Sequence, residues 1–261
     1  MFRLLPVLLL LLFTTSSFAA ERVVLLAPAA ADIIARLDAG ALVVGKTRNV
    51  EEFPQATEIG SHIRPNLEII ASLKPDLLVI SSNRFFSQEM AAKVGAKTFF
   101  YNPTSLEEIL SQTGQLASLL GREGQGKRLI EAQRQKLTQV KPLKSTPKVI
   151  YEITATPLTI AGTGSILADL VKAAGGELVS GGERKLLRFN PEGVLALQPK
   201  VYIWQVGPMN QNPTPPAERG EYRLLKADYL KVDELQYSRA NTASFDDVLE
   251  LNRYFLHREV Q

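Results

Sequence analysis

Short apolar runs alternate with amphipathic segments along most of the chain. The apolar runs are bounded by Pro, Gly or polar turns, as buried strands are, and the segments between them have helical periodicity. This alternation predicts an α/β fold with mostly parallel sheets covered on both faces. The predicted strands are Arg22–Leu26, Ala41–Gly45, Pro75–Ile80, Lys97–Tyr101, Lys148–Ile153 and Lys200–Trp204. The predicted helices are Ala29–Leu37, Asn66–Leu73, Gln88–Val94, Ser105–Leu120, Glu123–Val140, Ser165–Ala174, Pro191–Leu197 and Phe245–Leu256.

The clearest interruption of the pattern is the segment KPLKSTP at residues 141–147. It follows Glu123–Val140, which is rich in good helix formers, and the alternation resumes after it. We therefore predict two Rossmann-like α/β lobes joined by one long α-helix. The predicted boundaries are 20–121 for the first lobe, 122–145 for the connecting helix and linker, and 146–261 for the second lobe.

An internal repeat supports two related lobes. Residues 64–68 and 188–192 share the pattern R-x-N-x-E at a constant offset of 124. In both copies a predicted helix, an L-x-P step and an apolar strand follow, with Pro75 matching Pro199. Such agreement in register favours a duplication over chance similarity.

The repeat places one acidic residue at the start of a helix in each lobe. Asn66 and Asn190 are suited to cap a helix, and Glu68 and Glu192 then occupy the first turn, where the helix dipole favours a carboxylate. Local helix chemistry alone explains either residue. It does not explain why both lobes place a carboxylate at the same step, and two separated surface charges can align a partner.

The first residues have the pattern of a secretory signal. Met1–Arg3 gives a positive start, Leu4–Phe13 is apolar, and Ser17-Phe18-Ala19 offers a cleavage site. About ten apolar residues are too few to cross a bilayer of roughly 30 Å. We therefore expect a signal peptide over 1–19, cleaved after Ala19.

The chain contains no cysteine, so neither a lipid anchor on cysteine nor a disulfide is possible. An exported protein without such an anchor is retained near the cell by an outer membrane, and we expect a periplasmic location. The formal net charge is only +3, and no run of basic residues stands out. Nucleic acid is thus not an expected partner, and we expect a monomer without a cofactor.

Motifs spread over about 230 residues resemble one family. They are RVVLLAP at 22–28, NLE at 66–68, LKPDL at 73–77, LTIAGTGS at 158–165, AGGE at 174–177 and LQP at 197–199. Together they resemble the iron-chelate and vitamin B12 periplasmic binding proteins, which are ABC importer substrate-binding proteins with two lobes joined by a rigid helix. The resemblance implies that Glu68 and Glu192 meet arginines of a membrane permease dimer. It also implies only a small closure of the lobes.

A ligand of such a protein would lie between the lobes, at the carboxyl ends of the strands. Loops there supply arginines, which offer paired donors to carboxylates or catecholates, and rings, which offer flat apolar contact. The candidate ligand-binding residues are Arg48, His62, Arg64, Arg84, Phe85, Phe86, Trp204, Gln205 and Arg239, with Ser61, Asn83 and Met209 beside them.

The ligand class is less well determined. His62, Ser82 and Leu186 stand where the B12-binding relatives carry tryptophans, and Ser61 stands near the ligating tyrosine of haem-binding relatives. His62 and His257 are the only histidines, so a bare metal site built from several histidines is not expected. A siderophore-like iron chelate needs only cations and rings, so it leads, with cobalamin or haem as alternatives. His62 is a possible haem ligand.

Two other classes of function remain open. A secreted hydrolase could pair Glu152 with Asp169 or Glu192, but the sequence contains no nucleophile elbow, phosphate loop or metal-ligand spacing, so we expect no enzyme. A binding protein without a transporter, acting as a sensor or scavenger, is the third interpretation.

Overall fold

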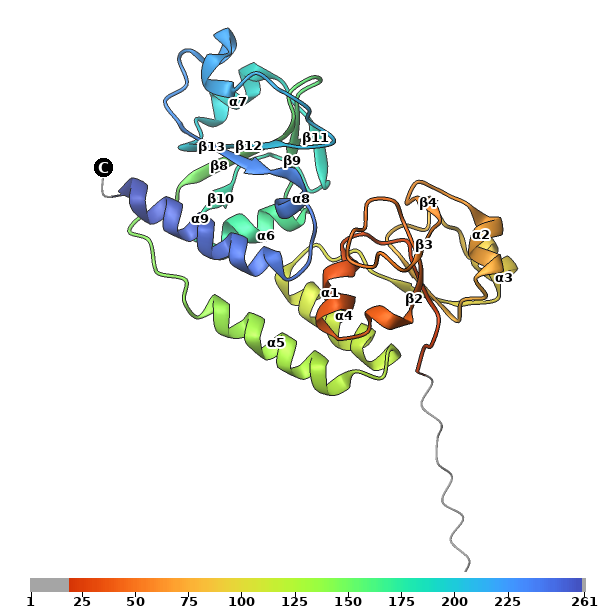
Figure 1. Ribbon diagram of the computed structural model, residues 1–261. Helices are drawn as coiled ribbons and strands as arrows, with labels where there is room; N and C mark the ends of the chain where they lie inside the picture. The colour runs from red at the N-terminus through yellow and green to blue at the C-terminus, as the bar shows by residue number, and fades with distance from the viewer. Residues whose placement is uncertain (1–18, 260–261) are drawn as a thin grey trace, which may run out of the picture.

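The structure is a computed structural model that describes residues 19–259. Two α/β lobes lie side by side and are connected by a long helix along one side (Figure 1). The two-lobe α/β fold predicted from the sequence is confirmed. The expected signal peptide falls almost entirely outside the described residues.

The N-terminal lobe is built on a five-stranded parallel sheet in the order β3-β2-β1-β6-β7. Its strands are β1 (Val23–Leu25), β2 (Val43–Lys46), β3 (Thr57–Glu58), β6 (Leu77–Ile80) and β7 (Lys97–Phe100). A small antiparallel hairpin, β4 (Gly60–Ser61) and β5 (Arg64–Pro65), lies beside the sheet. The helices are α1 (Ala30–Arg36), η1 (Gly40–Leu42), α2 (Leu67–Ser72), α3 (Gln88–Val94) and α4 (Leu106–Leu119).

Alternation along the central strand explains how this sheet is covered on both faces. Val23 and Leu25 pack into the large core cluster that includes α1 and α4. Val24 points to the opposite face, into a smaller cluster with α2 and α3. The continuous apolar run at this strand is therefore the signature of a strand buried on both sides.

The C-terminal lobe contains a six-stranded mixed sheet in the order β11-β9-β8-β12-β13, with β10 also paired to β8. Its strands are β8 (Lys148–Thr154), β9 (Thr159–Ala161), β10 (Glu177–Leu178), β11 (Leu186–Arg188), β12 (Val201–Val206) and β13 (Asp228–Asp233). Its helices are α6 (Ile166–Ala173), α7 (Pro191–Leu197), η2 (Pro216–Glu218), η3 (Gly220–Tyr222), α8 (Glu234–Tyr237) and α9 (Ala243–Glu259). β8, β10, β12 and β13 are parallel, whereas β9 and β11 form antiparallel pairs that the sequence did not predict.

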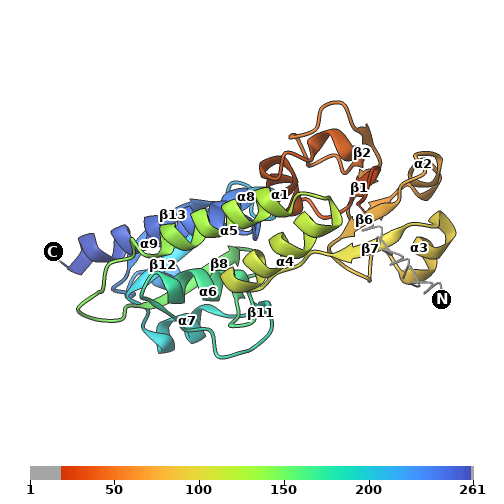
Figure 2. The same ribbon diagram turned by 90° about the horizontal axis from the view of Figure 1, so that it is seen from below.

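The connecting helix α5 spans Glu123–Leu137 and ends three residues before the predicted Val140. It lies along α4 and α9, as Figure 2 shows. A Cβ on Gly126 would come within 2.5 Å of the Ala117 Cβ, so glycine lets α5 approach α4 closely. The helix thus packs against both lobes rather than spanning open solvent.

The two lobes also meet directly. A single buried cluster contains residues of both sheets, including Leu25 and Val149. The Tyr101 hydroxyl donates to the Ala240 carbonyl (2.9 Å), and the Leu106 N–H donates to Asp169 Oδ2 (2.7 Å). Because buried polar groups need partners, these cross-lobe bonds fix the relative position of the lobes at the junction.

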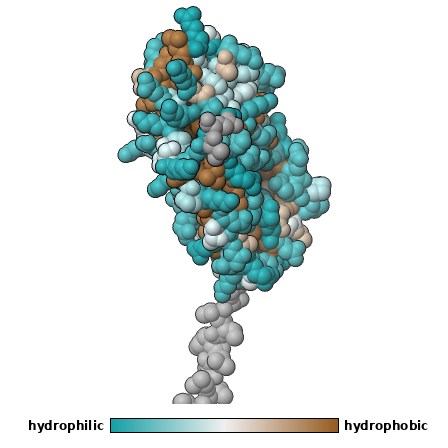
Figure 3. All heavy atoms as spheres, turned by 90° about the vertical axis from the view of Figure 1, so that its left-hand side faces the viewer, coloured by the Kyte–Doolittle hydropathy of each residue, from teal (hydrophilic) through white to brown (hydrophobic). Residues whose placement is uncertain are grey.

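Within residues 19–259, no helix has the length and apolar character needed to cross a membrane. The face of the C-terminal lobe in Figure 3 is mostly hydrophilic, with an apolar group near the top of the view.

Candidate functional site

A hollow of about 720 Å³ opens between the two lobes. Its N-terminal wall is the loop after β2, and its C-terminal wall combines the turn after β12 with α8 and the residues that follow. The lining residues are Arg48, Asn49, Glu51, Glu52, Pro208, Leu235 and Arg239. The Arg239 guanidinium donates to the Asn49 carbonyl across the lobes (Nη2 to O, 3.0 Å). Arg48 and Arg239, both predicted from the sequence, therefore come together in this hollow.

A second cationic contact joins the lobes at Lys185, which the sequence did not single out. Its ammonium donates to Asn102 Oδ1 in the loop after β7 (2.9 Å). Burial lowers the pKa of Lys185, and the nearby Glu108 opposes this. The loop before β11 holds the lysine close to the turn after β9, because the Gly162 N–H donates to its carbonyl (3.0 Å).

On the N-terminal lobe, His62, Arg84 and Phe85 form a small cluster from two loops. The His62 ring meets Phe85 edge-on at 6.2 Å between centroids, and the Arg84 guanidinium carbon lies 5.6 Å from the centre of that ring. The β4–β5 hairpin positions His62, and the loop after β6 positions the other two. A cation over an aromatic face is stabilising, more so when water is excluded.

His62 has an unusual environment within this cluster. Its Nδ1 is buried and has no hydrogen-bond partner among residues 19–259. Burial also lowers the pKa of the imidazole, because desolvation disfavours the charged ring. A neutral imidazole can accept a hydrogen bond or ligate a metal through an unprotonated nitrogen.

Most of the predicted ligand-binding side chains are accessible to solvent. The candidates that are exposed or half-buried are Arg48, Ser61, His62, Arg64, Asn83, Arg84, Phe85, Met209 and Arg239. Ile63, at the tip of the β4–β5 hairpin, is 48% exposed and was not predicted.

The structure corrects the positions of Phe86, Trp204 and Gln205. Phe86 is 1% exposed and packs under α3 in the smaller N-terminal cluster. The strand predicted to end at Trp204 continues to Val206, so Trp204 and Gln205 both lie within β12 and their side chains enter opposite faces of a covered sheet. Trp204 packs against Ile150 and its neighbours, and Gln205 is fully buried and accepts from the Tyr151 hydroxyl. All three side chains are therefore buried inside the lobes rather than exposed at the cleft.

Asn49, Glu51, Glu52, Pro208 and Leu235 line the hollow although sequence reasoning missed them. A usable signal existed for Asn49, Glu51, Glu52 and Pro208, because they lie in the loops that follow β2 and β12. Leu235 follows β13, which was not predicted.

The two acidic helix starts are placed as the repeat suggested. Glu68 and Glu192 are both exposed, in the first turns of α2 and α7. Asn66 Oδ1 accepts from the Ile69 N–H (3.0 Å), and Asn190 Oδ1 accepts from the Gly193 N–H (2.7 Å). The two lobes therefore present the same capped, acidic helix start.

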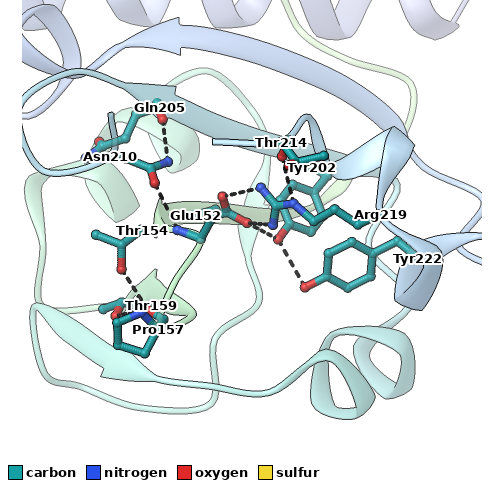
Figure 4. A network of polar contacts seen from close by, with 11 residues as sticks. Glu152, Thr154, Pro157, Thr159, Tyr202, Gln205, Asn210, Thr214, Arg219 and Tyr222 are labelled. Atoms are coloured by element: carbon teal, nitrogen blue, oxygen red, sulfur yellow. Dashed lines mark hydrogen bonds and ion pairs between the residues drawn. The ribbon is translucent and has the colours of Figure 1, made fainter. Parts of the chain in front are cut away.

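Glu152, Asp169 and Glu192 do not form the carboxylate pairs that a hydrolase would need. Glu152 is fully buried, and its carboxylate accepts two bonds from Arg219 (2.6 and 2.8 Å) and one from the Tyr202 hydroxyl (2.6 Å), as Figure 4 shows. Asp169 binds the Leu106 N–H at the lobe junction, and Glu192 is at the surface. Each carboxylate is committed to a different structural environment. Within residues 19–259, no cluster of three His, Cys, Asp or Glu residues could hold a metal ion.

This chain is similar in sequence to a heme uptake protein. The high-affinity heme uptake system protein IsdE of Staphylococcus aureus is 28% identical over 172 residues, which are 62% of this chain and 59% of that protein. The aligned part thus spans less than two thirds of the curated relative.

Two solved structures share the fold over nearly their whole length. The periplasmic vitamin B12 binding protein BtuF of Vibrio cholerae has a TM-score of 0.74 at 20% identity, covering 94% of this chain and 100% of the other. S. aureus IsdE complexed with heme has a TM-score of 0.74 at 23% identity, covering 90% and 98%.

The sequence match to a family is longer than the pairwise sequence alignment with IsdE. Residues 23–217, most of the chain, match the periplasmic binding protein family. The match begins at β1, continues through α5 and ends in the segment after β12, so it takes in parts of both lobes and the helix between them. The resemblance predicted from the sequence motifs is confirmed: the chain belongs to the periplasmic binding protein family.

Proposed function

We propose that this protein is the periplasmic substrate-binding protein of an ABC importer. It binds a siderophore-like iron chelate between its lobes and delivers it to a membrane permease dimer. The observation that carries the delivery role is the matched pair of Glu68 and Glu192. One exposed carboxylate on each lobe, at the same step of the same capped helix, gives a permease two points that fix orientation as well as contact.

The groups around the cleft support an anionic chelate. Arg48 and Arg239 line the inter-lobe hollow, and Arg84 lies over Phe85 on the N-terminal lobe. Guanidinium groups bind carboxylate or catecholate oxygens with paired donors, and the ring adds flat apolar contact. The carboxylates Glu51 and Glu52 in the same wall limit the net positive charge of the hollow.

Haem is the second candidate, favoured by one specific observation. The buried Nδ1 of His62 lacks a partner among the described residues, and a neutral imidazole is a common haem ligand. The sequence relative that is named as a heme uptake protein points the same way. Cobalamin has weaker support, because only the fold of the B12-binding structure is shared at that level of identity.

The ligand is tested by titrating the purified protein with the iron(III) complex of a tricatecholate chelator, with haemin and with cyanocobalamin. We expect the catecholate complex to bind best and Arg239→Ala to weaken it about tenfold, a loss typical of one charge-assisted hydrogen bond. A new haem absorbance spectrum that is lost in His62→Ala would instead establish haem as the cargo.

Delivery is tested separately with the Glu68→Ala, Glu192→Ala double variant. Uptake in cells that depend on this protein should be abolished, while ligand affinity is retained. A matched control is Glu89→Ala with Glu218→Ala, which removes one exposed carboxylate from each lobe outside the repeat. Loss of uptake in both double variants would show that general surface charge, rather than docking, is responsible.

A further inference from the structure

The turn that forms part of the C-terminal cleft wall is held from behind by a buried carboxylate. Gly207–Asn210 follows β12 and closes on itself, since the Asn210 N–H donates to the Gly207 carbonyl (3.0 Å). Pro208 lines the inter-lobe hollow, and the side chain of Met209 is 54% exposed. Met209 lines a neighbouring hollow together with Asn210 and Arg219, so Pro208 is the residue of this turn that lines the inter-lobe hollow.

Glu234, the first residue of α8, contacts the turn from the inside. It is 5% exposed, and its Oε2 accepts from the Met209 N–H (2.7 Å). A Cβ on Gly207 would come within 2.5 Å of the Glu234 Cβ, so the turn packs directly on this side chain. Position 207 consequently requires glycine.

The other anchor of the turn is Asn210, which does not depend on charge. Its side-chain amide donates to the Gln205 carbonyl (2.7 Å) and accepts from the Ala155 N–H (3.0 Å), as Figure 4 shows. These bonds fix the end of the turn to β12 and to the end of β8. At the tip of the turn, Glu234 accepts from the Met209 N–H (2.7 Å), and the Gln211 side-chain amide donates to the Pro208 carbonyl over a longer distance (3.4 Å).

We propose that Glu234 is a positioning residue for ligand recognition, whose ionised carboxylate binds the Met209 N–H and thereby holds Pro208 of the cleft wall in place. Ligand affinity should then fall when this carboxylate is protonated. The inference rests on the proposed function, because it assigns Glu234 to the same cleft. Glu234 does not touch the hollow itself and acts through the turn.

The surroundings of Glu234 make its protonation relevant to function. Burial raises its pKa, and the nearby Asp233 adds to this, while the Met209 and Asn210 N–H groups and Arg239 oppose it. Tyr151 of β8 faces the same region, together with Asp247 of α9 and Tyr237 of α8. The carboxylate therefore takes up a proton at higher pH than an ordinary glutamate, and its charge-assisted bond to Met209 weakens there.

The experiment compares Glu234→Gln with the wild-type protein in two measurements. The first is hydrogen–deuterium exchange of the Met209 and Asn210 amides in ligand-free protein at pH 8 and pH 5.5. The Met209 amide should exchange about tenfold faster in the variant at pH 8, and the difference should shrink at pH 5.5. Glu218→Gln is the control, because it removes an exposed carboxylate from the same lobe.

The second measurement is the affinity for the iron(III) tricatecholate complex over the same pH range. The ratio of wild-type to variant affinity should be about tenfold at pH 8 and should decrease as the pH is lowered. A Glu234→Asp variant keeps the carboxylate charge, but its side chain is one methylene shorter, so the carboxylate lies farther from the Met209 N–H. It should speed Met209 exchange at both pH values, which separates loss of contact from loss of charge.

Unchanged exchange at Met209 in Glu234→Gln would overturn the positioning role whatever the ligand is. Faster exchange with unchanged affinity would show that the turn is not part of the ligand site, which also overturns the proposal. If the probe binds neither protein, the proposed ligand class is wrong, and the exchange data alone decide whether Glu234 holds the turn.

Discussion

The two lobes share a scaffold, but they differ in how they use buried polar groups. Within the described part of the N-terminal lobe, Lys46 is the one charged residue in the buried set, and its ammonium binds the Val50 carbonyl (2.6 Å). The C-terminal lobe buries Glu152, Glu234 and Asp247. The difference follows from the connections between strands.

In the N-terminal lobe, helix α3 connects β6 to β7, and most of its backbone N–H and C=O groups are paired by hydrogen bonds within the helix. In the C-terminal lobe, residues 207–227 join β12 to β13 with only the short turns η2 and η3. Such a segment needs side-chain anchors, because its backbone makes few bonds to itself. Arg219 is the main one: it binds Glu152 and also donates to the Thr214 carbonyl (2.8 Å). The irregular lobe is thus the one that depends on buried charge.

The largest expected effect comes from breaking that anchor. Arg219→Ala leaves Glu152 buried without its cation and should reduce the free energy of unfolding by about 3 kcal/mol or more. Arg36→Ala in the N-terminal lobe removes an exposed ion pair with Asp32 and should cost no more than about 0.5 kcal/mol. Chemical denaturation measures both. Equal losses would mean that the lobes do not differ in this respect.

A smaller effect concerns pH and Asp247. Burial raises the pKa of Asp247 to about 7, while its bond from Gln236 opposes this. The folded state therefore binds a proton that the unfolded state releases near pH 4, so this group destabilises the fold as pH rises from about 4 to 7. Asp247→Asn should remove that loss. The urea midpoint of the variant should exceed that of the wild-type protein increasingly from about pH 5 to about pH 7, and a difference that stays constant over that range would contradict the assignment.

Removing the two helix caps tests a property in which the lobes should be alike, namely the contribution of each capping asparagine to the free energy of unfolding. Asn66→Ala and Asn190→Ala each remove one cap bond and should each cost about 1 kcal/mol in the free energy of unfolding. The two losses should agree within about 0.5 kcal/mol. A much larger loss at Asn190 would show that the C-terminal repeat unit has acquired a further structural role.

The smallest expected effect is on the two exposed acids themselves. Glu68→Ala and Glu192→Ala should leave the thermal midpoint nearly unchanged, because both side chains are at the surface. A clear destabilisation by either variant would mean that the carboxylate serves its own helix. The matched positions would then no longer support delivery.

The amino-acid sequence was sufficient to predict much of the fold. The order of strands and helices, the connecting helix and the capped acidic turns of α2 and α7 all follow from local periodicity and helix-start chemistry. The sequence pattern did not reveal β13, because Asp228–Asp233 mixes charged and apolar residues at a sheet edge. It did not reveal β9 either, because Thr159–Ala161 is too short to show a strand periodicity. These strands exist because neighbouring strands complete their hydrogen bonds.

The candidate site was only partly predictable for the same physical reason. Arg48, in the loop after a predicted strand, could be placed at the cleft from chain order alone, whereas the position of Arg239 depends on β13 and α8, which were not predicted. Whether Trp204 ends a strand or lies within it depends on the length of its partner strands. Likewise, Glu152 and Arg219 are 67 residues apart, and no local pattern joins them. Local sequence determines which helices and strands form. Burial and long-range pairing are decided only by the tertiary structure, and they determine which side chains face the cleft and which support the cleft wall from inside the lobe.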